Sequence, residues 1–141
     1  MAAPHKGVDT ITISEIISRL DTLRPNRFSD EIKIAWLSEL DGRLHSRLLS
    51  RFENCPAAPE TYSDHSQQLL IPQPYGSDIY CFYLQSCMDR ENGETGRYNQ
   101  SAALYNAALD SYRAHCLQTM TAKSAGPFKL KGDAPCPLSP F

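Results

Sequence analysis

The sequence predicts an all-α fold, a small four-helix domain with extended N- and C-terminal arms. Apolar residues recur at intervals of three and four in four separate segments, and each segment begins with residues that can cap a helix. Stretches rich in proline or glycine separate these segments. We expect helices near residues 12–24, 29–52, 77–95 and 100–119, in a helical domain of residues 12–120 between arms of residues 1–11 and 121–141.

The first helix is predicted from the stretch TISEIISRLDTLR. Thr12 and Glu15 have the spacing of a capping box, in which each side chain bonds a free backbone amide at the helix start. Pro25 ends the helix, because the residue before a proline is pushed out of helical geometry. One apolar stripe follows from the 3–4 spacing of Ile13, Ile16, Ile17, Leu20 and Leu23.

The second helix begins after Ser29, a residue that can cap it, and Asp30 and Glu31 suit the positive end of the helix dipole. Gly42 lies in the middle of this helix and predicts a bend or a close approach by another backbone. The buried side is expected to consist of Trp36, Leu37, Leu40, Leu44, Leu48 and Phe52.

Three arginines, Arg43, Arg47 and Arg51, share one face of the second helix. One interpretation is a contact stripe for phosphate or for an acidic partner. The other is a solvated face near the helix C-terminus, with Glu39 placed to pair with Arg43. The pattern favours the second interpretation and leaves the first open.

A proline-rich connection, residues 53–74, leads to the third helix. A connection of this length in a small domain is usually functional or wraps another element, and its LLIP stretch is apolar enough to reach the core. The third helix is expected to start near Ser77 and either to stop or to bend at Asn92-Gly93. The line of residues facing the core, flanked by Tyr80 and Leu84, is predicted to be Ile79, Phe82, Tyr83, Ser86, Cys87 and Arg90.

The fourth helix, capped by Asn99 or Ser101, carries tyrosines at seven-residue steps. Its predicted seam follows steps of 4, 3, 4, 3 and 4, with Ala103, Ala107 and Ala114 beside it. Tyrosine hydroxyls need water or an acceptor, so this seam is expected near the domain edge or a subunit boundary. The seam consists of Tyr98, Ala102, Tyr105, Leu109, Tyr112 and Cys116.

The centre of the hydrophobic core of the whole domain is predicted to consist of Trp36, Leu40, Leu44, Phe82, Tyr105 and Leu109.

The composition excludes several classes of protein. A net charge of −2 and a pI near 6.0 give no general attraction to nucleic acid or anionic membrane. No apolar run approaches the ~20 residues of a membrane span, and the N-terminus lacks the apolar core of a signal peptide, so we expect synthesis in the cytosol.

Motifs for catalysis or for binding cofactors and metals do not occur in the sequence. A glycine-rich phosphate loop, a GxSxG elbow and an HExxH pair are missing, and the cysteines form no CxxC pair. We expect neither cofactor nor metal and predict free thiols, with Cys81, Cys87 and Cys116 packed as small apolar residues.

Three stretches, taken together, resemble one family. They are LRPNRFSDEIKIAWLSELDGRLH at 23–45, LLIPQPYGSDIY at 69–80 and NGETGRYNQSAALYNAALDSY at 92–112. The specific features are the tryptophan-bearing helix, the P-x-P-Y start of the third helix and the NGE…RYN joint. Over residues 12–118 the chain resembles the head–tail connector (adaptor) proteins of tailed phages and prophages. The proline-rich connection and the C-terminal tail depart from that pattern.

The resemblance implies a non-enzymatic virion protein of the neck, at the head–tail junction, assembled in the host cytoplasm. Such adaptors form a ring, commonly twelve-fold, under the portal protein, dock the next stopper or tail protein, and let DNA pass through the lumen during ejection. No membrane is involved. A near-neutral chain fits this role, because a strongly basic channel would retain DNA.

Two alternatives remain: a stopper or tail-completion protein of the same neck, and a small helical regulator that binds DNA through the arginine face. Stoppers tend to be β-rich, and the acidic balance argues against a DNA-binding regulator.

The C-terminal tail, residues 121–141, has four prolines and cannot build a core alone. We expect it to be an assembly arm that lies extended against a neighbouring subunit or an adjoining ring, the portal above all. The expected contacts are the apolar anchors Phe128, Leu130 and Phe141, and the cations Lys123, Lys129 and Lys131.

Overall fold

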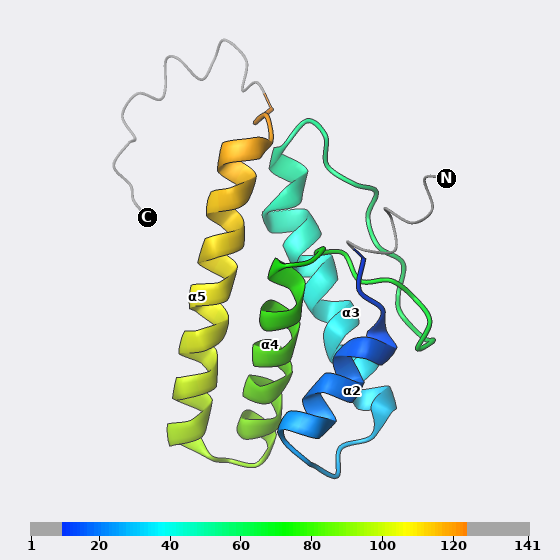
Figure 1. The fold of residues 1–141 in the computed structure, drawn as a ribbon, viewed down its shortest axis with the longest axis vertical. Coiled ribbons are helices and arrows are strands. Elements are labelled where there is room, and N and C mark those ends of the chain that lie inside the picture. The colour runs from blue at the N-terminus through cyan, green and yellow to red at the C-terminus, as the bar shows by residue number, and fades with distance from the viewer. Residues whose placement is uncertain (1–9, 124–141) are drawn as a thin grey trace.

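Residues 10–123 are described by the structure, a computed structural model, and they form the predicted all-α fold (Figure 1). Within this range there is no β-strand beyond two isolated bridges, Thr12 with Gln68 and Phe52 with Ala122. The elements in chain order are α2 (Ile13–Leu23), α3 (Asp30–Arg47), the 3-10 turn η1 (Leu49–Arg51), α4 (Tyr75–Glu91) and α5 (Thr95–Thr119).

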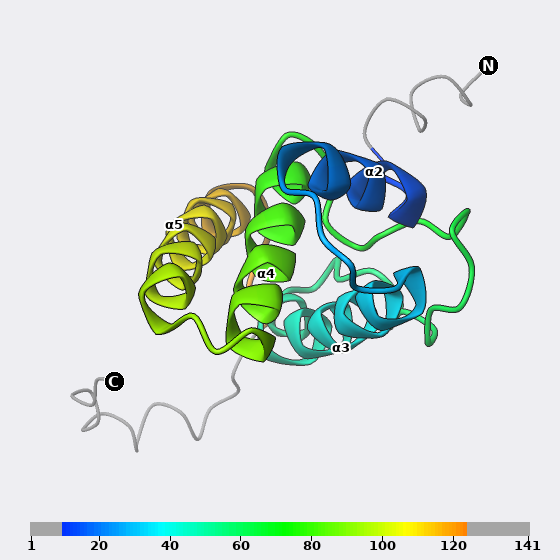
Figure 2. The ribbon, with the colours of Figure 1, turned by 90° about the horizontal axis from the view of Figure 1, so that it is seen from below.

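Helix α4 lies at the centre of the domain. Helices α2 and α3 pack on one side of it and α5 on the other, as the view along the helices shows (Figure 2). The turn between α4 and α5 settles the question that the sequence left open: α4 stops at Glu91. Gly93 follows with a φ of +72°, a conformation that glycine adopts without a steric penalty.

The N-terminal caps predicted for the first two helices are present, whereas the cap predicted at Asn99 or Ser101 is wrong, because α5 begins earlier, at Thr95. The Thr12 hydroxyl accepts a hydrogen bond from the Glu15 amide, and the Glu15 carboxylate accepts one from the Thr12 amide, which completes the capping box. Ser29 Oγ accepts from the Ile32 amide at 3.2 Å. Local sequence therefore determines where α2 and α3 begin.

The connection of residues 53–74 descends beside α3, reaches the start of α2 and returns to the top of α4 (Figure 1). Backbone hydrogen bonds join it to α2, including Ile13 N to Gln67 O at 3.0 Å. As predicted for the LLIP stretch, Leu69 and Ile71 are buried in the core. Gly76 permits this path, because a Cβ there would lie 2.4 Å from the Ile71 carbonyl oxygen.

The predicted core is confirmed in part. Leu40 and Leu44 are buried, whereas Trp36, Tyr105 and Leu109 are half-buried and pack against the core. The same structure places the three cysteines Cys81, Cys87 and Cys116 in the core as free thiols, as expected, and Cys55 is free and half-buried.

Helix α4 departs most from its predicted face. Phe82 is half-buried and lies outside the core cluster, and Arg90 is exposed, so both predictions were wrong. The two residues expected to flank the core, Tyr80 and Leu84, are instead fully buried. A central helix with neighbours on opposite sides buries most of its circumference, so a single inner line underestimates its contacts.

Several local predictions need correction. Helix α3 ends at Arg47 rather than near residue 52, and the separate turn η1 follows it. Helix α4 begins at Tyr75 rather than near Ser77, and α5 begins at Thr95 rather than near residue 100. Of the two alternatives expected at Gly42, a close approach by another backbone is wrong for residues 10–123, because nothing there lies within 4 Å of a Cβ built at this position. The predicted arms fall largely outside residues 10–123; within that range, Ile11 is already buried in the core.

Candidate functional site

Asp41, on α3, is a fully buried carboxylate that binds the long connection. Its Oδ2 accepts hydrogen bonds from the Tyr62 hydroxyl at 2.5 Å and the Leu70 amide at 2.9 Å. Its Oδ1 accepts one from the Tyr80 hydroxyl at 2.6 Å, and that hydroxyl in turn accepts from the Ile71 amide at 2.8 Å. These residues, which we call the Asp41 network, fix the connection against α3 and α4.

Burial raises the pKa of the Asp41 carboxyl above its ordinary value, while the hydrogen bonds from Tyr62, Tyr80 and Leu70 act in the opposite direction. Burial, together with the nearby Asp41, also raises the pKa of both tyrosine hydroxyls. The phenols therefore remain protonated donors near neutral pH, which suits a fixed structural role.

A groove of about 630 Å³ lies beside this network, between the first half of α3 and residues 61–63. Buried Ile34 and Tyr62 contribute apolar surface to it, and exposed Glu31 and Glu39 stand along it. The Asp41 network positions one wall, because Tyr62 bonds Asp41 through its hydroxyl and Ser38 Oγ through its amide at 3.0 Å. The groove is therefore a preformed acidic surface with an apolar floor.

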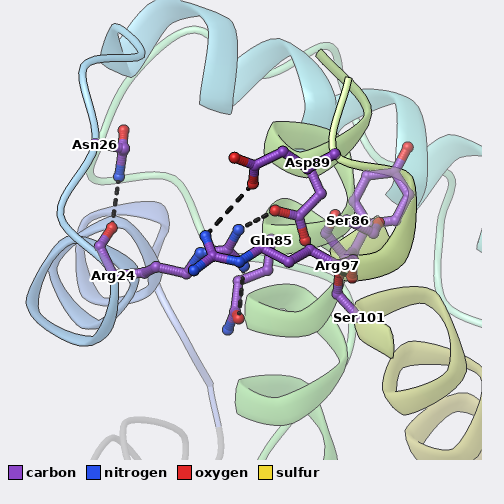
Figure 3. A network of polar contacts seen from close by, with 9 residues as sticks. Arg24, Asn26, Gln85, Ser86, Asp89, Arg97 and Ser101 are labelled. Carbon is purple, nitrogen blue, oxygen red and sulfur yellow. Dashed lines mark hydrogen bonds and ion pairs between the residues drawn. The ribbon is translucent and has the colours of Figure 1, made fainter. Parts of the chain in front are cut away.

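A second buried carboxylate, Asp89, joins three helices near the α4–α5 turn (Figure 3). Arg24, which caps the end of α2, forms an ion pair with Asp89 Oδ1 and donates to Gln85 Oε1 at 3.2 Å. Ser101 of α5 donates to Asp89 Oδ2 at 2.6 Å. These residues form the Asp89 network, and Arg97 of α5 lines the same cleft as Arg24.

The tyrosines of α5 pack against aromatic residues of α4. The ring of Tyr105 lies 5.4 Å from that of Tyr83, and the ring of Tyr112 lies 5.4 Å from that of Tyr75. Burial raises the pKa of Tyr105 to about 12. Two of the three tyrosines in the seven-residue repeat, Tyr105 and Tyr112, thus form a packing seam with α4.

The three arginines predicted as a contact stripe are all exposed. Arg43 donates to the Tyr83 hydroxyl at 3.1 Å and also interacts electrostatically with Glu39. The Arg51 carbonyl accepts from the Lys123 amide at 2.9 Å. The other partner-binding residues predicted from the sequence lie outside residues 10–123: Phe128, Lys129, Leu130, Lys131 and Phe141.

Sequence reasoning did not find Asp41, Asp89 or the buried Lys33. Lys33 is in fact 2% exposed and its Nζ lies 2.8 Å from Asp21 Oδ1. The missed signal was a charged residue in an apolar pattern: Lys33, Leu37, Leu40 and Leu44 follow steps of 4, 3 and 4.

Comparisons of the chain with models of protein families, curated proteins and solved structures return no match. Among residues 10–123, no three acidic, histidine or cysteine side chains gather as metal ligands would. The helices within the same range are too short or too polar to cross a membrane.

Proposed function

We propose that this chain is a structural subunit of a tailed-phage neck, a head–tail connector (adaptor) that assembles as a ring under the portal. The ring docks the next neck or tail protein and leaves a lumen through which DNA passes. The proposal rests on the resemblance of three stretches to the adaptor family and on one structural observation, the uncovered outer side of α5.

Helix α5 carries this proposal because, among the elements of residues 10–123, it packs against α4 alone. Of its 25 residues only Ser101, Tyr112 and Cys116 are buried, so the described part of the chain leaves most of the helix surface uncovered. Leu104 and Leu117 are 50% and 66% exposed. Apolar side chains on a helix with a free side suit contact with another subunit. In a ring, each subunit would present this surface to a different surface of its neighbour.

The two buried networks add support, because they join the three stretches that resemble adaptors. Asp41 from the first stretch binds Leu70 and Tyr80 from the second. Through Asp89, Arg24 from the first stretch is linked to Ser101 from the third. The resembling residues thus build one folded unit, as expected if a common architecture underlies the resemblance.

The mass of the particle in solution tests this proposal. A twelve-fold ring of 15.8 kDa chains has a mass of 12 × 15.8, about 190 kDa, and mass photometry at several protein concentrations measures it directly. We expect the double variant Leu104→Glu and Leu117→Glu to shift the protein to monomers, because buried glutamates would oppose association.

A matched control places the same substitutions at Leu23 and Ile32, which are 59% and 43% exposed on other helices. This control should leave the ring mass unchanged. A wild-type protein that stays monomeric at every concentration, or equal dissociation of both double variants, would contradict self-assembly through α5.

A further inference from the structure

The groove beside the Asp41 network has the chemistry of a receptor for a basic, partly apolar segment. Glu31 and Glu39 stand exposed along it. Glu39 also interacts electrostatically with Arg43, one turn further along α3. Ile34 and Tyr62 are buried beneath and supply an apolar floor. An occupant that places apolar side chains on the floor and cations near the rim would complement both features.

The chain itself carries such a segment, Pro-Phe-Lys-Leu-Lys at residues 127–131. In an extended segment alternate side chains point to opposite faces, so Phe128 and Leu130 can face one surface together. Lys129 and Lys131 would then stand at the rim, where their long aliphatic stems let the ammonium groups reach carboxylates. The alternation of apolar and basic residues therefore matches the groove.

The described chain ends on the far side of α3 from its own groove. The Lys123 amide is bonded to the Arg51 carbonyl oxygen, at the far end of α3 from the groove. Five more residues to Phe128 span at most ~18 Å. The sixteen residues from Arg51 back to Ala35, at the centre of the groove, span about 24 Å at helical rise. Phe128 can thus enter a neighbour's groove more readily than its own.

We propose that residues 127–131 of one copy bind in the α3 groove of an adjacent copy, with Phe128 and Leu130 on the floor and the two lysines paired with Glu31 and Glu39. This inference rests on the proposed self-assembly. It gives the C-terminal arm a specific receptor within the ring and makes each subunit both donor and acceptor of an arm.

Photo-crosslinking of the full chain tests the inference. Phe128 is replaced by p-benzoylphenylalanine, a photoreactive aromatic of similar shape, and copies labelled with ¹⁵N are mixed with unlabelled copies before assembly. After irradiation, mass spectrometry identifies the joined peptides. We expect crosslinks from position 128 to residues 31–39 or 61–63, in pairs that join a heavy copy to a light one.

Charge reversal supplies the matched controls. Glu31→Lys with Glu39→Lys should lower the crosslink yield about tenfold, since two attractive pairs become repulsive. Adding Lys129→Glu and Lys131→Glu to the same chain should restore it. Glu53→Lys with Glu91→Lys makes the same change at exposed sites away from the groove and should have no effect. Circular dichroism confirms that each variant is folded.

The outcomes separate this inference from the proposed function. A ring whose crosslinks from position 128 avoid the groove, or join only copies of the same isotope, overturns the arm-in-groove contact and leaves the ring intact. Failure of the restoring variant overturns the charge pairing. A protein that remains monomeric contradicts both proposals together.

Discussion

Asp41 and Asp89 are both fully buried carboxylates, yet the protein satisfies them in different ways. Asp41 receives two tyrosine hydroxyls and one backbone amide, all of them uncharged. Asp89 receives a serine hydroxyl and the guanidinium of Arg24, whose side chain is 25% exposed. One network thus holds a buried charge with dipoles alone, and the other pairs it with a cation that reaches in from the surface.

The difference follows the elements that each network joins. The Asp41 network fixes irregular backbone, residues 62 and 70–71, where directional hydrogen bonds define the path of a chain that lacks repeating structure. The Asp89 network joins the ends of three helices, where one ion pair links elements that are already rigid. We infer that loss of Asp89 weakens the whole domain, whereas changes around Asp41 act first on the connection and its groove.

Replacing Asp89 should therefore have the largest effect. Asp89→Ala removes the partner of a largely buried arginine and is expected to lower the free energy of unfolding by about 4 kcal/mol. Urea denaturation measures this change. Asp110→Ala is the control, because Asp110 is paired with Arg113 on the surface and should cost less than about 1 kcal/mol. Similar losses for the two variants would show that the Asp89 network contributes little.

Removing single hydroxyls from the Asp41 network should have intermediate effects. Tyr80→Phe leaves both Asp41 Oδ1 and the Ile71 amide without a partner, so we expect a loss of about 3 kcal/mol. Tyr62→Phe removes one hydrogen bond, with a second donor still on the same oxygen, and should cost about 1.5 kcal/mol. Equal costs would indicate that the amide of Ile71 finds another acceptor.

The raised pKa of Asp41 predicts a smaller, pH-dependent effect. Between about pH 4, the ordinary pKa of an aspartate, and its raised folded-state pKa, the folded protein holds more protons than the unfolded chain. The Asp41 contribution to the free energy of unfolding therefore falls as pH rises through this window.

Urea denaturation between pH 4 and 7 should show the stability difference between wild type and Asp41→Asn shrinking with rising pH. Asp64→Asn is the control, because hydrogen bonding from Ser66 lowers the pKa of that exposed carboxyl and its contribution should not shrink over this range. A difference that grows with pH would mean that the folded-state pKa of Asp41 is lowered instead.

Gly42→Ala should have the smallest effect and the opposite sign. Gly42 is next to Asp41 within α3, and, its own stretch of helix aside, no atom of residues 10–123 lies within 4 Å of the site of its Cβ. Alanine should stabilise the helix by about 0.5–1 kcal/mol because it loses less backbone entropy on folding. Thermal denaturation measures the gain, and a destabilised variant would show that α3 needs glycine here.

Local signals made much of the fold predictable. The capping box at Thr12, the cap at Ser29 and the 3–4 spacing of the leucines depend on residues within a few positions of each other, so a single sequence displays them. The same holds for the α5 seam, whose tyrosines pack against α4.

The buried networks could not be predicted because their partners are distant in sequence. Tyr80 follows Asp41 by 39 residues, and Asp89 follows Arg24 by 65. Ser101 shows how this misled the prediction of α5: its hydroxyl suggested a helix cap, but in the structure it donates to Asp89. A polar residue that can satisfy a local amide can equally satisfy a distant carboxylate, and the sequence pattern is the same in both cases.

The proposed structural role at the head–tail junction is tested most directly by deleting the coding sequence from the genome that carries it and imaging the resulting particles by electron microscopy. The account predicts DNA-filled heads and separate tails that do not join, with joining restored when the protein is supplied from a plasmid. Antibody labelling of complete virions should then place the protein at the neck. Normal yields of joined, infectious particles without the protein would contradict the account.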